Sequence, residues 1–179
     1  MTLKINAVKL TSFLKQKSLK IALAESCTGG LASSAISEIQ GASAVFWGAF
    51  VTYTVQAKNS ALSVPPGLIA EYGAVSRETA CAMAEGALSV SGADAAAAVT
   101  GLAGPAGDAA PPLKRPAAKV GDVWIAVCAR CGEAGFKTRA ALLRLKGGRN
   151  AVRKKAAAKL LYLLREALED EFGRAGAKF

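Results

Sequence analysis

Short apolar runs alternate with helix-like segments through the first two-thirds of the chain. Three of these runs lead directly into polar or glycine-rich stretches, as buried strands do where they leave a sheet. Two further apolar runs flank Gly132 and Gly135 and indicate an antiparallel pair, and a long amphipathic segment closes the chain. The pattern predicts an α/β fold in which a mixed β-sheet lies between layers of helices. No change of composition marks a boundary, so we expect a single domain over residues 1–179 with an approximate core over residues 4–172.

The expected elements follow from periodicity and from capping residues. We expect strands over residues 20–24, 44–53, 93–99, 122–128 and 136–145, and helices over residues 4–17, 31–38, 56–62 and 149–171, with a short helix between the Pro65-Pro66 turn and Tyr72. A further helix, capped by Ser76, ends near Val90. The run 44–53 is rich in valine and aromatic residues, which suits a buried strand. The run 93–99 has the alanine content of a helix, but it is short and abuts Thr100-Gly101, which favours a strand.

The chain contains no histidine, and this excludes several kinds of active site. A Ser–His–Asp triad, a Cys–His dyad and a histidine-ligated metal are all impossible. Any catalytic base is therefore a lysine, a carboxylate, a tyrosine or a thiolate. Among the four cysteines only Cys128 and Cys131 form a CxxC pair, and no second pair completes a zinc site. We expect free thiols, with redox or metal chemistry at the pair as the lesser alternative.

The net charge of +10 is concentrated in the last third of the chain. From residue 114 onward there are 16 of the 23 basic residues but only 6 of the 13 acidic ones. This asymmetry favours an anionic partner, although charge that serves only solubility explains it equally well. Aromatic residues do not alternate with the basic ones, so nucleic acid is the less favoured partner. Without an apolar run of about 18 residues or a signal peptide, we expect a soluble cytoplasmic protein with no membrane association.

The first candidate site is the stretch ESCTGG, which follows the strand 20–24 and opens a helix. Ser26 lies where open α/β sheets bind ligands, and Cys27 beside it is the rival nucleophile. Gly29 and Gly30 permit a tight turn, so free amides at the helix start would receive a phosphate or stabilise an oxyanion. The alternative is that Ser26 or Thr28 only caps the helix.

Two further strand exits supply candidate partners for this serine. A lone lysine such as Lys58 is usually solvated, but without histidine a serine nucleophile needs another base, and a desolvated lysine is the known alternative. Tyr53 at the end of a strand would either contact a ligand or pack. Thr100 and Gly101 begin a glycine-rich turn after the strand 93–99, so they should emerge at the same edge of the sheet as Ser26.

The closing helix carries its charges in the order opposite to that favoured by the helix dipole. Basic residues occupy its first turns (Arg149, Arg153, Lys154, Lys155), and acidic residues occupy its end (Glu166, Glu169, Asp170, Glu171). An anion held by Arg149 and the amides at the helix start would explain this arrangement. A phosphate site and a merely basic surface are equally open at this point.

Six motifs together resemble the CinA C-terminal domain family, whose stand-alone members include the nicotinamide mononucleotide deamidases. They are AESCTGG at 24–30, TYTVQAK at 52–58, GAVS at 73–76, TGLAGPAGD at 100–108, VGDVW at 120–124 and GGRNAVR at 147–153. Their order and intervals match along essentially the whole chain.

The resemblance implies an α/β domain that hydrolyses the carboxamide of nicotinamide mononucleotide to nicotinic acid mononucleotide and ammonia. It implies Ser26 as the nucleophile, Lys58 as its base and Arg149 as the holder of the 5′-phosphate. The other implied substrate-binding residues are Thr28, Gly29, Gly30, Tyr53, Thr100 and Gly101. Neither a metal nor an organic cofactor is needed. Alanine-rich helices additionally favour a homo-oligomer.

Three positions depart from the family's motifs. Val55 replaces an asparagine, Gly148 replaces an aspartate before Arg149, and Asp108 replaces a glycine in the loop 105–119, which is also longer and more basic. These departures bear on substrate and efficiency more than on the fold. They leave open a degenerate member that binds a nucleotide without turnover. A basic protein associated with nucleic acid is the remaining alternative.

Overall fold

The structure, a computed structural model, describes residues 2–107, 112–114, 116–132 and 135–172. Its strands are β1 (Ile21–Glu25), β2 (Phe46–Val51), β3 (Ala95–Gly101), β4 (Asp122–Arg130) and β5 (Phe136–Arg144). Its helices are α1 (Leu3–Lys17), α2 (Leu31–Ser37), the short 3₁₀ helix η1 (Ala42–Ala44), α3 (Val55–Leu62), α4 (Pro66–Tyr72), α5 (Arg77–Ser91) and α6 (Arg149–Phe172). Almost all expected boundaries lie within two residues of these.

The five strands form one mixed sheet in the order β2-β1-β3-β4-β5. β1 lies between β2 and β3 and is parallel to both. β4 is antiparallel to β3 and to β5. The carboxyl ends of β1, β2 and β3 therefore meet at one edge of the sheet, and this edge carries the candidate residues. The predicted α/β class with a mixed sheet is confirmed.

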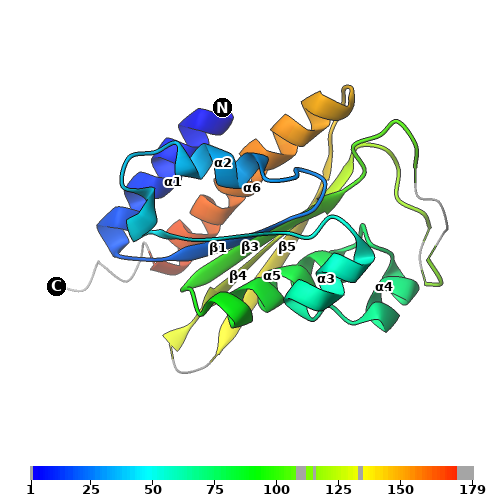
Figure 1. Cartoon of the computed structure of the whole chain (residues 1–179), viewed down its shortest axis with the longest axis horizontal. Coiled ribbons are helices and arrows are strands. Elements are labelled where there is room, and N and C mark those ends of the chain that lie inside the picture. The colour runs from blue at the N-terminus through cyan, green and yellow to red at the C-terminus, as the bar shows by residue number, and fades with distance from the viewer. Residues whose placement is uncertain (1, 108–111, 115, 133–134, 173–179) are drawn as a thin grey trace.

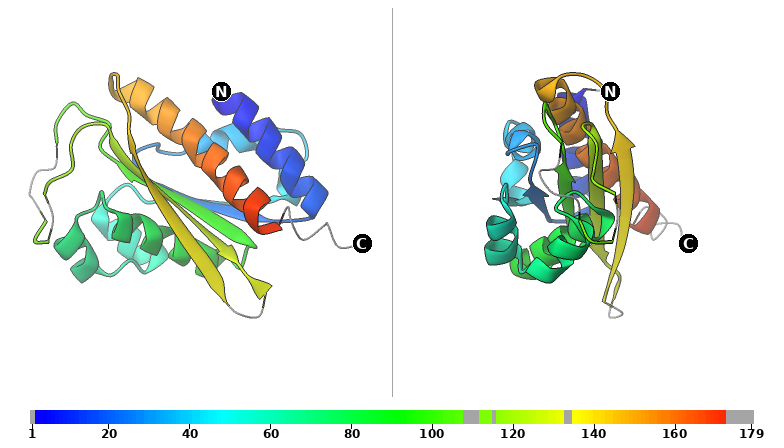
Figure 2. Two further views of the ribbon diagram at one scale, coloured as in Figure 1. Left: turned by 180° about the vertical axis from the view of Figure 1, so that it is seen from behind. Right: turned by 90° about the vertical axis from the view of Figure 1, so that its right-hand side faces the viewer.

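Side chains that alternate along the strands form a separate hydrophobic core on each face of the sheet. Ile21 and Leu23 face a core that they share with α1, α2 and α6, whereas Ala22 and Ala24 face a core shared with α3, α4 and α5. The two helical layers lie above and below the sheet in Figure 1, and α6 runs beside α1 in the rear view of Figure 2. This alternation, carried by short and mostly apolar strands, is what holds a sheet between two layers.

Local capping fixes where the helices of the second layer begin. The Ser76 hydroxyl accepts a hydrogen bond from the Thr79 amide at 3.0 Å, which makes Ser76 the N-cap of α5 as expected. In the same way the Thr54 hydroxyl accepts from the Ala57 amide at 3.0 Å and starts α3 at Val55. The start of α3 matters because the fourth residue of this helix is Lys58.

The expectation of a buried strand over residues 44–53 is wrong in two respects. Ala44 ends η1, and the strand begins only at Phe46. β2 also lies at the edge of the sheet, because it pairs only with β1, and Trp47 and Val51 are about half exposed. Valine and aromatic residues suit an edge strand as well as a central one, so composition did not distinguish the two.

Some expectations fall partly or wholly outside the described residues. Asp108 is one of these, as are residues 109–111 and 115 of the loop 105–119 and residues 133–134 between β4 and β5. Within that loop, residues 113 and 114 donate backbone hydrogen bonds to α4, and Lys114 forms an exposed ion pair with Glu71 at 3.0 Å. Within the described ranges, no helix has the length and apolar character needed to span a bilayer.

Candidate active site

A cavity of about 190 Å³ opens where the parallel strands end. It is lined by Ser26, Cys27, Tyr53, Lys58, Ala74, Val75, Thr100, Gly101, Leu102, Ala103, Gly104, Ala106 and Arg149. Six of the nine residues expected to form the site are in this lining: Ser26, Tyr53, Lys58, Thr100, Gly101 and Arg149. The structure leaves the other three, Thr28, Gly29 and Gly30, outside it.

Ser26 and Lys58 meet at the bottom of this cavity. Lys58 Nζ lies 3.0 Å from Ser26 Oγ and donates a hydrogen bond to it. The amine also donates to the carbonyl oxygens of Thr52 at 2.8 Å and Tyr53 at 3.4 Å. Ser26 directly follows the last residue of β1. Lys58 lies in the first turn of α3, the helix that follows the neighbouring strand β2.

Burial makes the Lys58 amine harder to protonate than the amine of an ordinary, solvated lysine. Its side chain is 1% exposed, and this desolvation lowers the pKa of Lys58 from 10.5 to about 8. No salt bridge to Lys58 is present within the described ranges, so no carboxylate restores the charged form. About a tenth of the amine is therefore uncharged at pH 7 and about half at pH 8, and the uncharged form is the one that can accept a proton from a serine.

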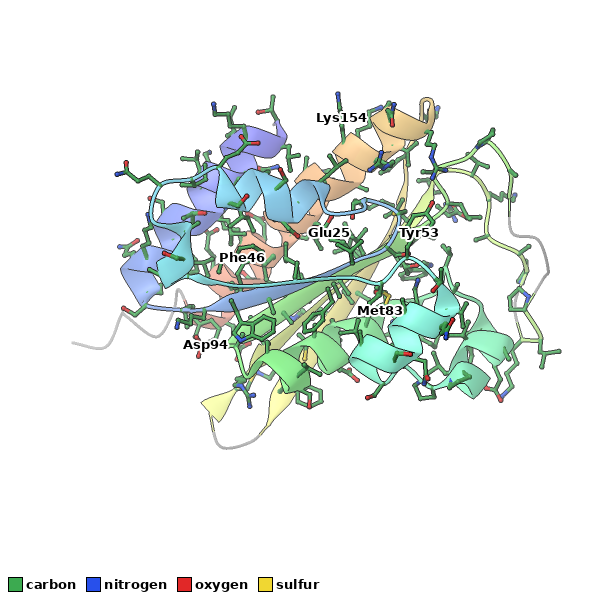
Figure 3. The ribbon with its side chains drawn as sticks, in the orientation of Figure 1. Glu25, Phe46, Tyr53, Met83, Asp94 and Lys154 are labelled. Atoms are coloured by element: carbon green, nitrogen blue, oxygen red, sulfur yellow. The ribbon has the colours of Figure 1, made fainter. Side chains whose placement is uncertain are left out.

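Glu25 holds the turn that carries Ser26, and it was missed by the sequence analysis. Its buried carboxylate accepts hydrogen bonds from the amides of Gly30 at 3.0 Å, Ala32 at 3.2 Å and Ser33 at 2.8 Å, and also from the Ser33 hydroxyl. Figure 3 shows Glu25 directly below α2. The expectation of free amides at this helix start is wrong, because a carboxylate of the chain already satisfies them.

Arg149 lies at the mouth of the cavity, at the first residue of α6. Its Nη1 donates to the Gly104 carbonyl at 2.6 Å, and its Nη2 donates to the Tyr53 hydroxyl at 2.7 Å. Tyr53 is 56% exposed, so this contact joins two groups at the rim rather than in the core. Arg149 therefore connects the exit of β2, the glycine-rich turn after β3 and the start of α6.

A second arginine of α6, which the sequence analysis did not assign to the site, also contacts the turn. Arg153 Nε donates to the Cys27 carbonyl at 3.2 Å, and Arg153 Nη2 donates to the Thr28 carbonyl at 3.0 Å. Arg149 and Arg153 are four residues apart, so they share one face of the helix. That spacing was the available signal, although it does not indicate which carbonyls are contacted.

The cysteines have the properties of ordinary buried or half-buried thiols. Cys27 lines the cavity, but burial raises its pKa to about 11, so it is protonated at neutral pH. Burial likewise raises the pKa of Cys128, which lies within β4, to about 11. All four cysteines are free. Cys131 donates from Sγ to Glu171 Oε1 at 3.2 Å, and the described ranges contain no cluster of metal-ligating side chains.

Two of the departures from the family's motifs lie beside the cavity rather than in its lining. Val55 is the first residue of α3 and is 44% exposed. Gly148 immediately precedes α6 and is exposed. Neither residue is among those that line the cavity.

Comparison with known proteins gives a consistent result. The family model of the CinA C-terminal domain matches residues 4–168. A CinA-like protein of Akkermansia muciniphila is 44% identical over 158 residues, which cover 88% of this chain and 36% of that protein. A putative competence-damage inducible protein of Symbiobacterium thermophilum is 43% identical over 159 residues, with 87% and 36% covered. The chain thus matches about a third of the length of these relatives.

Solved structures resemble the whole described chain. The competence/damage inducible protein CihA from Agrobacterium tumefaciens superposes with a TM-score of 0.80 at 38% identity, covering 93% of this chain and 95% of that one. The competence damage-inducible protein A (ComA) from Klebsiella pneumoniae superposes with a TM-score of 0.84 at 28% identity, covering 94% and 98%.

Proposed function

The chain belongs to the CinA C-terminal domain family, and we propose that it hydrolyses the carboxamide of nicotinamide mononucleotide to nicotinic acid mononucleotide and ammonia. The observation that carries this proposal is the buried contact of 3.0 Å between Lys58 Nζ and Ser26 Oγ. A serine beside an uncharged amine is a nucleophile beside its base, which is the arrangement that acyl transfer requires.

The first chemical step transfers a proton and forms one bond. The uncharged Lys58 amine keeps its two donors on the carbonyls of Thr52 and Tyr53 and turns its lone pair toward the Ser26 hydroxyl. It takes the hydroxyl proton as Ser26 Oγ attacks the carboxamide carbon. The resulting oxyanion meets the Cys27 amide, which follows the nucleophile and is hydrogen-bonded to no described backbone carbonyl.

The second half of the reaction returns the enzyme to its starting state. The Lys58 ammonium gives its proton to the departing nitrogen, ammonia leaves, and an ester of Ser26 remains. Water then attacks this ester with Lys58 again as the base, which releases the carboxylate product and restores the serine. Lys58 suits both roles because its pKa of about 8 is close to the pH at which it works.

The rest of the mononucleotide extends to the rim. A cavity of about 190 Å³ is smaller than the roughly 300–1,000 Å³ of typical small-molecule sites, so it encloses only part of such a substrate. With the pyridine ring beside Ser26, the phosphate reaches the rim where Arg149 lies. A guanidinium is suited to bind phosphate through two parallel hydrogen bonds, and here it would exchange its contacts with Tyr53 and Gly104 for the substrate.

The test is ammonia release from nicotinamide mononucleotide by the wild-type protein and by three variants. Ser26→Ala and Lys58→Met should each lose at least about a hundredfold in kcat. Cys27→Ala should keep the wild-type rate within about threefold, because its thiol is protonated and plays no part. Mass spectrometry of the denatured protein after a rapid quench should find the acyl group on the peptide that contains Ser26.

Two results would overturn the proposal. Wild-type rates in both Ser26→Ala and Lys58→Met would remove the mechanism. Stabilisation of the protein by the mononucleotide with no ammonia released would replace hydrolysis with the alternative of binding without turnover.

A further inference from the structure

Two side chains of opposite charge hold the turn between β1 and α2. Glu25 accepts hydrogen bonds from the amide of Gly30 at the end of the turn and from the amides of residues 32 and 33 in the first turn of α2. Arg153 donates to two carbonyls of the turn, at Cys27 and Thr28. Within the turn, the Gly29 amide donates to the Ser26 carbonyl at 3.1 Å, so this turn of 26–29 is also closed on itself.

These contacts fix the direction in which the peptides of the turn point. In each peptide unit the N–H and C=O groups point in opposite directions. The Ser26 carbonyl is bound to the Gly29 amide, so the Cys27 amide is directed away from the interior of the turn. Arg153 fixes the next two carbonyls, and a rotation of either peptide would break a charge-assisted hydrogen bond.

Arg153 is placed to act on the turn alone. It is partly buried, its hydrogen bonds go neither to Ser26 nor to Lys58, and it is not among the residues that line the cavity. A third side-chain hydrogen bond, from Nη1 to Asn150 Oδ1 at 3.3 Å, stays within α6. Gly29 has a φ of +59°, and a Cβ there would lie 3.3 Å from Arg153 Nη2, so the guanidinium lies tightly against the turn.

We propose that Arg153 is a positioning residue for hydrolysis: it clamps the carbonyls of Cys27 and Thr28 so that the Ser26 hydroxyl and the Cys27 amide stay aimed into the cavity. This inference rests on the proposed function for its rate measurement. Its role differs from that of Arg149, which lies at the rim, because Arg153 does not reach the substrate. Loss of the clamp therefore lowers the rate of attack and leaves binding of the substrate nearly unchanged.

The experiment compares Arg153→Ala, Arg153→Lys and the matched control Lys154→Met, which removes an adjacent exposed charge. Arg153→Ala should lower kcat by about thirtyfold or more and change KM by less than about threefold. Guanidinium chloride at millimolar concentration should restore part of the lost kcat of Arg153→Ala, whereas sodium chloride at equal ionic strength should not. Arg153→Lys keeps the positive charge but lacks the planar fork that reaches both carbonyls, so it should be intermediate, and Lys154→Met should behave like the wild type.

A second measurement separates this proposal from the proposed function. Diisopropyl fluorophosphate reacts with a serine when Ser26 Oγ forms a bond to phosphorus, Lys58 takes the proton and fluoride leaves. Intact mass then gives the rate of labelling without any nicotinamide substrate, and Ser26→Ala gives the background. Labelling should be about tenfold or more slower in Arg153→Ala and partly restored by guanidinium.

The outcomes are distinct. If the wild type releases no ammonia but labelling depends on Arg153 as expected, the proposed substrate is wrong and the clamp stands. If Arg153→Ala is folded by circular dichroism and keeps both the wild-type kcat and the wild-type labelling rate, the clamp is wrong. If Arg153→Ala does not fold, Arg153→Lys decides by the same two rates.

Discussion

Lys58 is the residue whose environment most determines what the site can do. It is among the largest fully buried side chains of the protein, yet it is ionisable. Burial of a lysine without a counter-ion disfavours the ammonium, so the same feature that weakens folding prepares a base. Predictions at the scale of the residue therefore follow from one quantity, the pKa of about 8.

The rate of hydrolysis should depend on pH through this amine. Only uncharged Lys58 accepts the serine proton, so kcat/KM should rise about tenfold per unit below pH 7 and level off above about pH 8. Initial rates of ammonia release between pH 5.5 and 9.5, in buffers of constant ionic strength, test this. A flat profile across that range would exclude Lys58 as the base.

The stability of the protein should depend on the same group. Between about pH 8 and pH 10.5 the unfolded chain holds a proton on Lys58 that the folded chain has lost, so wild-type stability rises with pH across this window. Relative to Lys58→Met, the wild type should gain about 3 kcal/mol in unfolding free energy from pH 7 to pH 10.5. Urea unfolding of both proteins at several pH values measures the difference, and parallel curves would contradict it.

At the scale of the element, the position of α3 is set by its contact with α5. A Cβ added at Gly86 of α5 would lie 2.1 Å from the carbonyl oxygen of Leu62, the last residue of α3. Only glycine allows the two helices to approach this closely. Because α3 carries Lys58 four residues before Leu62, the distance between the base and the serine depends on this contact about one helical turn away.

Gly86→Ala should therefore be destabilising although alanine is the better helix former. We expect a loss of about 1–3 kcal/mol in unfolding free energy from the clash, together with a lower kcat as α3 shifts. Gly67→Ala in α4 is the matched control, because a Cβ there meets nothing within 4 Å and the change should be neutral or stabilising. Denaturant unfolding and ammonia release check both variants, and equal effects in the two would refute the argument.

The reversed charge pattern of α6 also has its explanation at this scale. Arg149 and Arg153 at the start of the helix donate to carbonyls of other segments. Near the end of the helix, Glu169 pairs with Arg165 and Asp170 pairs with Arg139 of β5. Contacts of this kind outweigh a dipole effect of a few tenths of a kcal/mol. The sequence indicated that the pattern needed a reason, but not that carbonyls supply it for the arginines.

At the scale of the whole molecule, the site is assembled from segments that the sheet brings to one edge. Ser26 follows β1, Lys58 follows β2, Thr100 and Gly101 end β3, and Arg149 begins α6. A ligand that spans these segments binds only the folded chain, so it should raise the temperature of unfolding.

Nicotinic acid mononucleotide, the proposed product, is the suitable ligand because it is not consumed. At a hundred times its dissociation constant it should stabilise the wild type by about 3 kcal/mol. At the same concentration the stabilisation of Arg149→Met should be much smaller, since the phosphate loses its guanidinium. Nicotinic acid, which lacks the ribose phosphate, is the control ligand and should stabilise the wild type and Arg149→Met equally. Equal stabilisation of both by the mononucleotide would remove Arg149 from the phosphate site.

The molecule also shows which features a sequence can predict. The alternation of apolar runs predicted the sheet, and the missing histidine directed attention to Lys58, which lies beside Ser26. The roles of Glu25 and Arg153 were not predicted, because contacts with amides and carbonyls leave no pattern in side-chain type. The edge position of β2 was missed for a similar reason, since the order of strands is a property of the whole sheet.

The amine and both carbonyls that orient it belong to one continuous piece of seven residues, from Thr52 to Lys58. If this piece moves as a unit, the direction of the Lys58 lone pair stays the same while the distance from Lys58 Nζ to the Ser26 hydroxyl changes. Substitutions in the surrounding helices would then change the distance between Lys58 Nζ and Ser26 Oγ rather than the angle at which the two atoms meet. A family built on this piece could tune its turnover by small translations of one short segment, without rebuilding the dyad itself.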